Sequence, residues 1–213
     1  MQIKLTNVIP APLAGIAFDD KCLWGKSIEI DTKGVVLVKA ASGRGKSTLI
    51  SFLYSNRRDF SGNIDLDGKN IKEISLDELS IMRQSRLSVV FQELRLFPNL
   101  TARENIEVKY RLSEGVKYEE IGLLADKLGM KNYLDQTCGT LSLGQQQRVA
   151  IIRALIQPFE FLMMDEPFSH LDKVNAELAM SIITERCKEQ NAGMLITSLG
   201  EEHGVNFTQQ LTV

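Results

Sequence analysis

A run of apolar residues leads into a glycine-containing loop and then into a helix, and this order constrains the fold more than any other feature of the chain. The run is residues 35–38, and the loop reads Ser42-Gly43-Arg44-Gly45-Lys46-Ser47-Thr48. A continuous, β-branched apolar run is typical of a strand buried on both faces of a parallel sheet. Leu49, Ile50 and Leu53 give the residues after the loop an apolar helical face. A buried strand followed at once by a helix predicts a βα unit of an α/β protein.

The loop has the pattern of a phosphate-binding loop, or P-loop. Its glycines let backbone amides close on phosphates, and the helix that follows adds positive potential. We expect Lys46 to reach the β- and γ-phosphates of a bound nucleotide and the hydroxyl of Ser47 to bind Mg²⁺. Ala40 stands where the usual pattern begins with glycine. If that position needs a positive φ, the methyl group costs about 1 kcal/mol and weakens or displaces binding.

A second apolar run, residues 161–164, ends in the adjacent carboxylates Asp165 and Glu166. Parallel sheets present polar groups to ligands at the carboxyl ends of their strands. We expect Asp165 to hold Mg²⁺, partly through water, and Glu166 to polarise the attacking water as general base. The alternative is an acidic pair that caps the following turn, which the P-loop upstream disfavours.

Composition narrows the class of protein. The 213 residues are 44% hydrophobic and 24% charged, as in a globular protein with a real core. The net charge of -2 argues against nucleic acid as a partner, because phosphate binding normally shows as a basic excess. The three cysteines lack metal-like spacing and are interpreted as reduced thiols. Neither a signal peptide nor an apolar run of membrane-spanning length is expected, so work at a membrane would need a partner.

Strand and helix signals alternate along the rest of the chain. Capping boxes are predicted where Ser75 precedes Glu78 and where Thr101 precedes Glu104. Strands are expected at 28–31, 62–68, 88–91 and 194–197, and helices at 118–128 and 173–189. Residues 93–155 are expected to be mainly helical. The pattern predicts a mostly parallel sheet with a second, smaller helical lobe.

The stretch Leu141-Ser142-Leu143-Gly144-Gln145 lies shortly before the carboxylate pair. Together with the P-loop and the carboxylates, it resembles the nucleotide-binding domain of ATP-binding cassette (ABC) proteins, whose signature reads Leu-Ser-Gly-Gly-Gln. The resemblance implies that Ser142, Gly144 and Gln145 face the γ-phosphate of ATP bound by the opposite subunit. Leu143 replaces the first glycine and adds bulk at that contact. The alternative is an amphipathic helix for which Ser142 is only the N-terminal cap.

Two further motifs follow the same family order. Gln92 comes after the strand at 88–91 and is similar to the family's Q-loop glutamine, which implies contact with Mg²⁺ or with the attacking water. Residues 94–100 then lie where family members contact a membrane partner, unless their apolar side chains pack between the lobes. Residues 169–172 resemble the D-loop, which crosses the dimer interface.

The position that stacks on adenine has two candidate residues in this chain, and a second position carries a different residue from the family's. Phe18 lies at about the place where the family stacks an aromatic ring on adenine, and Trp24 is the nearby alternative. The family reads Thr-His after its last motif strand, but this chain has Ser198 at the histidine position. A hydroxyl is shorter and uncharged, so we expect slow hydrolysis with ATP binding largely intact. His203 is interpreted as a loop histidine and His170 as an interface or surface residue.

The resemblance covers nearly the whole chain and implies an α/β fold, a P-loop NTPase of ABC type. A mostly parallel sheet core, an antiparallel β part and an inserted helical lobe are expected. Residues 1–213 would form a single ABC ATPase domain. Within it, residues 1–92 and 156–213 would form a RecA-like core with the β lobe, and residues 93–155 the helical lobe.

The function implied is that of the ATP-hydrolysing subunit of an ABC transporter. Two copies would sandwich two Mg-ATP and drive separate integral membrane subunits from the cytoplasmic face of the cell membrane. An ATP-gated dimerisation or signalling module with negligible hydrolysis is the second hypothesis. The DNA-repair and chromosome branch of the family needs a long coiled coil between P-loop and signature, which the roughly 90 intervening residues do not supply. The transported substrate would be chosen by membrane subunits outside this sequence.

Overall fold

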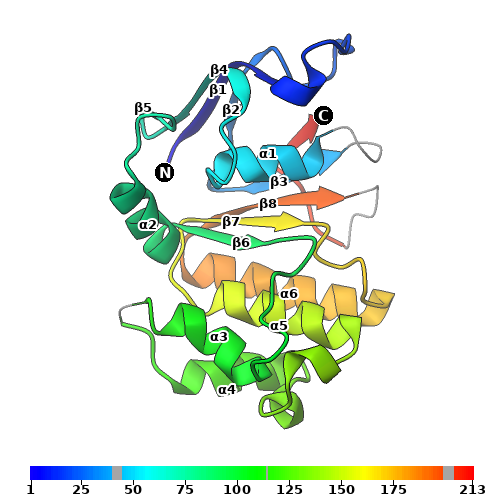
Figure 1. Cartoon of the computed structure of the whole chain (residues 1–213). Coiled ribbons are helices and arrows are strands. Elements are labelled where there is room, and N and C mark those ends of the chain that lie inside the picture. Colours follow the sequence, from blue (N-terminus) through cyan, green and yellow to red (C-terminus); the bar gives the residue numbers. More distant parts are fainter. Residues whose placement is uncertain (40–44, 114, 199–203) are drawn as a thin grey trace.

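A computed structural model describes residues 1–39, 45–113, 115–198 and 204–213 of the chain. Within them the chain forms two β-sheets and six α-helices (Figure 1). The helices are α1 (Lys46–Leu53), α2 (Leu76–Ser85), α3 (Ala102–Tyr110), α4 (Glu119–Lys127), α5 (Leu143–Leu155) and α6 (Lys173–Glu189). Short 3-10 turns lie at Ala11–Leu13, Lys131–Tyr133 and Cys138–Thr140.

The larger sheet is parallel and carries its strands in the order β6-β7-β8-β3-β9. Its strands are β3 (Val35–Lys39), β6 (Leu87–Val90), β7 (Phe161–Asp165), β8 (Gly193–Ser198) and β9 (Gln209–Thr212). Side chains of β7 alternate between two apolar clusters, with Leu162 and Met164 in one and Phe161 and Met163 in the other. The sheet is therefore covered on both faces, as the apolar runs predicted.

The smaller sheet is antiparallel, in the order β2-β1-β4-β5. Its strands are β1 (Ile3–Pro10), β2 (Ser27–Ile30), β4 (Phe60–Leu66) and β5 (Lys69–Asn70). Helix α1 lies between this sheet and the parallel one (Figure 1). Buried residues of both sheets and of α1, such as Leu5, Phe52 and Met163, belong to one apolar cluster. This cluster fixes the position of α1 and of the loop that leads into it.

Helices α5 and α6 cover the opposite face of the parallel sheet, and α3 and α4 pack against α5 on the side away from the sheet (Figure 1). The predicted capping boxes are confirmed: the hydroxyl of Ser75 accepts the amide of Glu78 at 3.2 Å, and that of Thr101 accepts the amide of Glu104 at 3.1 Å. Between residues 93 and 155 the three helices α3, α4 and α5 alternate with turns. No helix among the described residues is both long and apolar enough to cross a bilayer.

Strand β9 is an addition to the predicted sheet. It pairs with β3 in parallel, with Leu211 opposite Val38. Three of its four residues are polar, namely Gln209, Gln210 and Thr212. An edge strand needs little apolar character because it is covered less completely than a central one, so no apolar run marked it in the sequence.

Candidate functional site

Strands β3, β7 and β8 end at the same edge of the parallel sheet (Figure 1). The register places Asp165 of β7 opposite Thr197 of β8, and Ser198 opposite Lys39 of β3. Helix α1 begins at this edge with Lys46, seven residues after Lys39, the last residue of β3. Residues that are about 120 positions apart in the sequence therefore meet here.

Gly45 occupies a backbone conformation that other residues avoid. Its φ is +105°, and a Cβ placed on it would lie 3.2 Å from the ring of Trp24 and 3.4 Å from Cδ1 of Leu13. Gly45 caps α1 without a side-chain hydrogen bond, so the first amides of the helix remain available to an anion. Of the other predicted loop residues, Ala40, Ser42, Gly43 and Arg44 lie outside the described residues.

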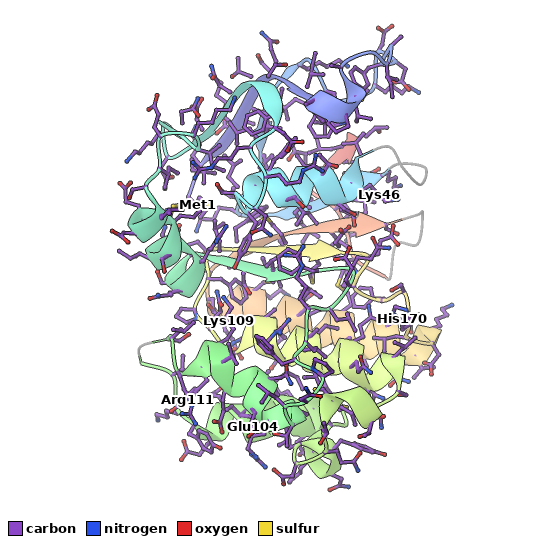
Figure 2. The ribbon with its side chains drawn as sticks, viewed as in Figure 1. Met1, Lys46, Glu104, Lys109, Arg111 and His170 are labelled. Atoms are coloured by element: carbon purple, nitrogen blue, oxygen red, sulfur yellow. The ribbon has the colours of Figure 1, made fainter. Side chains whose placement is uncertain are left out.

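Lys46 and Glu166 form an ion pair, with Nζ 3.2 Å from Oε1. Lys46 is only 6% exposed, and Figure 2 shows it at the start of α1. Oε2 of the same carboxylate lies 3.5 Å from Nε2 of Gln92, whose Oε1 lies 3.5 Å from Oγ of Ser47. The structure thus brings four of the predicted site residues into one chain of polar contacts.

The carboxylate of Asp165 is buried beside this chain of contacts. Burial raises its pKa, while hydrogen bonds from Ser47 and Thr197 oppose the rise. The hydroxyl of Thr197 lies 2.7 Å from Oδ1 of Asp165 and accepts the backbone amide of Glu166 at 3.0 Å. Glu166 itself has a φ of 46°, which turns the chain sharply at the end of β7. A buried carboxylate with a raised pKa is stabilised by a nearby cation.

Replacing Asp165 with asparagine should stabilise the ligand-free protein. The native state binds a proton at Asp165 more tightly than the unfolded chain does, so the wild type loses stability as pH rises from about 4 through the raised pKa. The amide carries no charge, and the variant should therefore unfold at a higher temperature than the wild type at neutral pH.

Thermal denaturation of both proteins across a pH series measures this difference. The gap between them should shrink towards pH 3, and Mg-ATP should stabilise only the wild type. An Asp165→Asn protein that unfolds below the wild type at pH 7 would contradict the expectation. Glu185→Gln on the exposed surface is a matched control with no expected effect.

The signature residues begin α5. The hydroxyl of Ser142 accepts the amide of Gln145 at 3.3 Å, and Oε1 of Gln145 accepts the amide of Ser142 at 2.9 Å. Leu143 is 56% exposed at the first helical position. A Cβ on Gly144 would lie 2.9 Å from the carbonyl oxygen of His170, so a glycine permits this close approach.

Gln147 is a site residue that the sequence did not single out. It is 1% exposed, and its Nε2 donates to the backbone oxygen of Glu166 at 3.3 Å. Its Oε1 accepts the amide of His170 at 2.8 Å. One side chain thereby ties α5 to the segment that leaves β7, on which Figure 2 labels His170. The only sequence signal was its place in a run of three glutamines after Gly144.

The two aromatic residues considered for stacking on adenine, Phe18 and Trp24, lie in or against the apolar core. Trp24 is 2% exposed and meets the ring of Phe52 edge-on, with centroids 6.3 Å apart. Phe18 is half-buried and packs against the same apolar cluster. Neither ring is among the described residues that line the hollow beside Lys46.

Ser198, expected at the histidine position of the family, lies at the same edge of the sheet as Asp165. Ser198 is buried and is the last residue of β8, directly after Thr197. His170 is exposed, with Nδ1 3.1 Å from Oγ of Ser169. His203 lies outside the described residues.

The family model described as ABC transporter matches residues 25–169. The chain belongs to the ABC transporter family. This ABC chain is 32% identical over 183 residues to the macrolide export ATP-binding/permease protein MacB of Bdellovibrio bacteriovorus, covering 85% of the chain and 28% of MacB. It is 33% identical over 181 residues to the thiamine import ATP-binding protein ThiQ of Vibrio vulnificus, covering 83% of the chain and 74% of ThiQ.

Solved structures show the same architecture. A dimeric structure of a bacterial ABC transporter cassette superposes with a TM-score of 0.84 at 24% identity, covering 99% of this chain and 94% of that one. A post-hydrolysis state of that cassette, bound to ADP and phosphate, gives a TM-score of 0.75 at 27% identity, covering 93% of this chain and 88% of that one. The predicted ABC-type fold is thereby confirmed. The chain spans 26% to 39% of the length of the first six curated relatives.

Proposed function

We propose that this chain is the ATP-hydrolysing part of an ABC transporter. The observation that carries the proposal is the meeting of Lys46, Ser47, Gln92, Asp165 and Glu166 at one edge of the parallel sheet. These side chains supply a cation, two Mg²⁺ ligands and a carboxylate base at the start of a helix. Phosphoryl transfer depends mainly on such positioning and charge stabilisation.

The residues present fit a triphosphate with Mg²⁺. Gly45 lets the start of α1 approach the phosphates, and Lys46 carries the charge that pairs with them. Ser47 and Asp165 would hold Mg²⁺, with Gln92 beside them, and a buried carboxylate whose pKa is raised by burial gains from that charge. Mg²⁺, when bound, neutralises charge that develops on the phosphates.

The carboxylate of Glu166 accepts the proton of the attacking water in this proposal. Its backbone is fixed by Thr197 at the amide and by Gln147 at the carbonyl, so the carboxylate is held by contacts on both sides. Its Oε1 pairs with Nζ of Lys46 at 3.2 Å. Phosphates that draw Lys46 away would leave the carboxylate to accept a proton from water.

A second copy of the chain is proposed to complete the site. Ser142, Gly144 and Gln145 lie at the start of α5, and their hydrogen bonds stay within that helix start. Exposed Leu143 beside them is available for contact with another molecule. The dimeric structure of a similar cassette supports pairing of two copies.

We further propose how the chain divides into lobes and where in the cell it acts. Residues 1–92 and 156–213 form the RecA-like core with its β lobe, and residues 93–155 form the helical lobe. Membrane partners hold the chain at the cytoplasmic face, supported by the export and import proteins among its relatives. Phe97, which is 50% exposed after Gln92, marks the segment proposed to contact them.

Replacing Glu166 with glutamine tests pairing and hydrolysis together. The amide keeps the shape of the side chain but removes the base, so turnover should fall about a hundredfold or more. ATP should then accumulate unhydrolysed and hold two chains together, which light scattering measures as a doubled mass. Glu119→Gln, at an exposed glutamate of α4, is the matched control and should hydrolyse like the wild type. A variant that hydrolyses ATP at the wild-type rate would refute the role of Glu166.

A further inference from the structure

The side chain of Gln92 is exposed and has few contacts that hold it in place. Its two polar contacts, to Glu166 and to Ser47, are both 3.5 Å long, which is at the limit for a hydrogen bond. Contacts of this length do not fix an exposed amide. The position of Gln92 is therefore set by the backbone on either side of it, which is strand β6 before it and residues 93–95 after it.

The chain after Gln92 turns through two residues in the left-handed conformation. Leu94 has a φ of 58° and Arg95 a φ of 48°, and neither is a glycine. A residue with a Cβ loses free energy in this conformation, and two in succession persist only where neighbouring groups hold them. The buried side chain of Leu94 anchors the loop, but it does not by itself select the left-handed backbone of Arg95.

The side chain of Arg153, on α5, contacts the backbone of both left-handed residues. Its Nη1 donates to the carbonyl of Arg95 at 2.8 Å, and its Nη2 donates to the carbonyl of Leu94 at 2.5 Å. Figure 1 shows the segment between β6 and α3 running past α5. A guanidinium presents its donors in a fixed planar fork, so two successive carbonyls accept from it only when both point towards it. The contact with Arg153 therefore favours the observed backbone of Leu94 and Arg95.

Burial of the Arg153 guanidinium costs free energy that these two hydrogen bonds offset. The side chain is half-buried, and burial lowers the pKa of Arg153. Within the part of the chain that the structure describes, no carboxylate forms an ion pair with it. Burial, together with the charges of Arg153 and Arg83, lowers the pKa of Lys109 to about 8. A cation among other cations is retained only where its hydrogen bonds compensate, and those of Arg153 go to the loop after Gln92.

The same helix also holds the backbone of the residue that Gln92 contacts. Gln147 of α5 donates to the carbonyl of Glu166 at 3.3 Å. Helix α5 thus fixes the backbone on both sides of the contact between Gln92 and Glu166, through Gln147 on one side and through Arg153 on the other.

We propose that Arg153 is a positioning residue, which holds Leu94 and Arg95 in the left-handed conformation and so keeps the amide of Gln92 between Ser47 and Glu166. The inference rests on the proposed function, since it concerns how Gln92 is held in that site. Without the two hydrogen bonds, the loop takes up other conformations, and only the remaining fraction of molecules is competent for hydrolysis. Phosphate binding at the start of α1 uses other groups, so the turnover number should fall more than the affinity.

Arg153→Met tests the proposal in the whole chain. The change removes both hydrogen bonds and the buried charge but keeps an apolar side chain of similar length, so the fold should persist. We expect the turnover number to fall about tenfold and the KM for ATP to change less than about twofold. The amides of residues 93–96 should exchange with deuterium faster. Arg148→Met, at a second half-buried arginine of α5 that donates to the carbonyls of Gly144 and Leu128, is the matched control and should leave exchange in this loop unchanged.

A glycine at position 95 tests whether Arg153 acts through the conformation of the loop. Glycine adopts a positive φ without the cost that alanine carries, and both changes equally remove the Arg95 side chain from the ring of Phe91. In the Arg153→Met protein, Arg95→Gly should give turnover about three- to fivefold above that with Arg95→Ala, and slower exchange. With Arg153 present, the two changes should differ much less. Arg153→Lys keeps the charge without the fork, so its exchange should be intermediate, and it covers the case in which methionine unfolds the protein.

Three results would overturn the proposal. The first is wild-type exchange of residues 93–96 in the Arg153→Met protein, and the second is equal turnover of the glycine and alanine double variants. The third is wild-type turnover in Gln92→Ala, because Arg153 would then not act through Gln92. A wild type that does not hydrolyse ATP refutes the proposed function instead, and hydrogen exchange still decides whether Arg153 holds the loop.

Discussion

Replacing Lys46 with alanine is expected to lower the affinity for Mg-ATP by about a hundredfold or more. Lys46 is only 6% exposed, so its ammonium group acts in surroundings where water screens charge weakly. Lys46 and Arg57 are the two cations among the described residues that line the hollow, and it is Lys46 that pairs with Glu166. Its loss leaves the phosphates facing Glu166 without a compensating charge. Isothermal titration calorimetry with a non-hydrolysable ATP analogue measures the change.

Because Lys46 pairs with Glu166, the effect of Lys46→Ala must also be measured in the Glu166→Gln protein. Lys46→Ala also leaves Glu166 without this partner, and the resulting repulsion of phosphate would exaggerate the loss. The same substitution in the Glu166→Gln protein removes that contribution and should still weaken binding strongly. Lys173→Ala, at an exposed lysine, is the matched control. Equal affinity of the wild type and both Lys46 variants would show that this loop does not bind the nucleotide.

Replacing Ser198 with histidine is expected to raise the turnover number about 10²- to 10³-fold while changing ATP affinity little. Ser198 directly follows Thr197, whose hydroxyl holds both Asp165 and the amide of Glu166. A histidine there would add a hydrogen-bond donor beside Glu166, the proposed general base. One donor aimed at charge that develops in the transition state is typically worth about 3–4 kcal/mol. Steady-state phosphate release measures the turnover number.

Substitutions of His170 and His203 test whether either histidine already takes the role that is proposed for a histidine at position 198. Ser198→Ala should leave turnover low, whereas His170→Ala and His203→Ala should not alter it in the wild type. If Ser198→His has no effect and His203→Ala abolishes hydrolysis, then His203 acts as the switch residue. Ser198 is buried, so thermal denaturation must show that the larger ring is accommodated. Hydrolysis that stays undetectable in all variants would favour the ATP-gated dimerisation module.

Local patterns in the sequence determined most of the secondary structure. The helix α6 was expected at residues 173–189 and is observed at Lys173–Glu189. The capping boxes at Ser75 and Thr101 were readable because each uses residues three positions apart. The strand before Lys46 and the strand before Asp165 were readable because apolar runs mark buried strands. Such features depend on hydrogen bonds and burial within a few residues.

Contacts between distant residues were decided only by the tertiary structure. Thr197 reaches Asp165 because the register of β7 and β8 places them opposite each other. Gln147 reaches Glu166 because α5 packs beneath the end of β7. Leu13 meets the P-loop because β1 ends over α1, where one apolar cluster holds both sheets. The sequence by itself predicted the residues to which we assign the proposed phosphate chemistry. Strand register and helix packing decided which further side chains contact them, since neither is encoded by spacing along the chain.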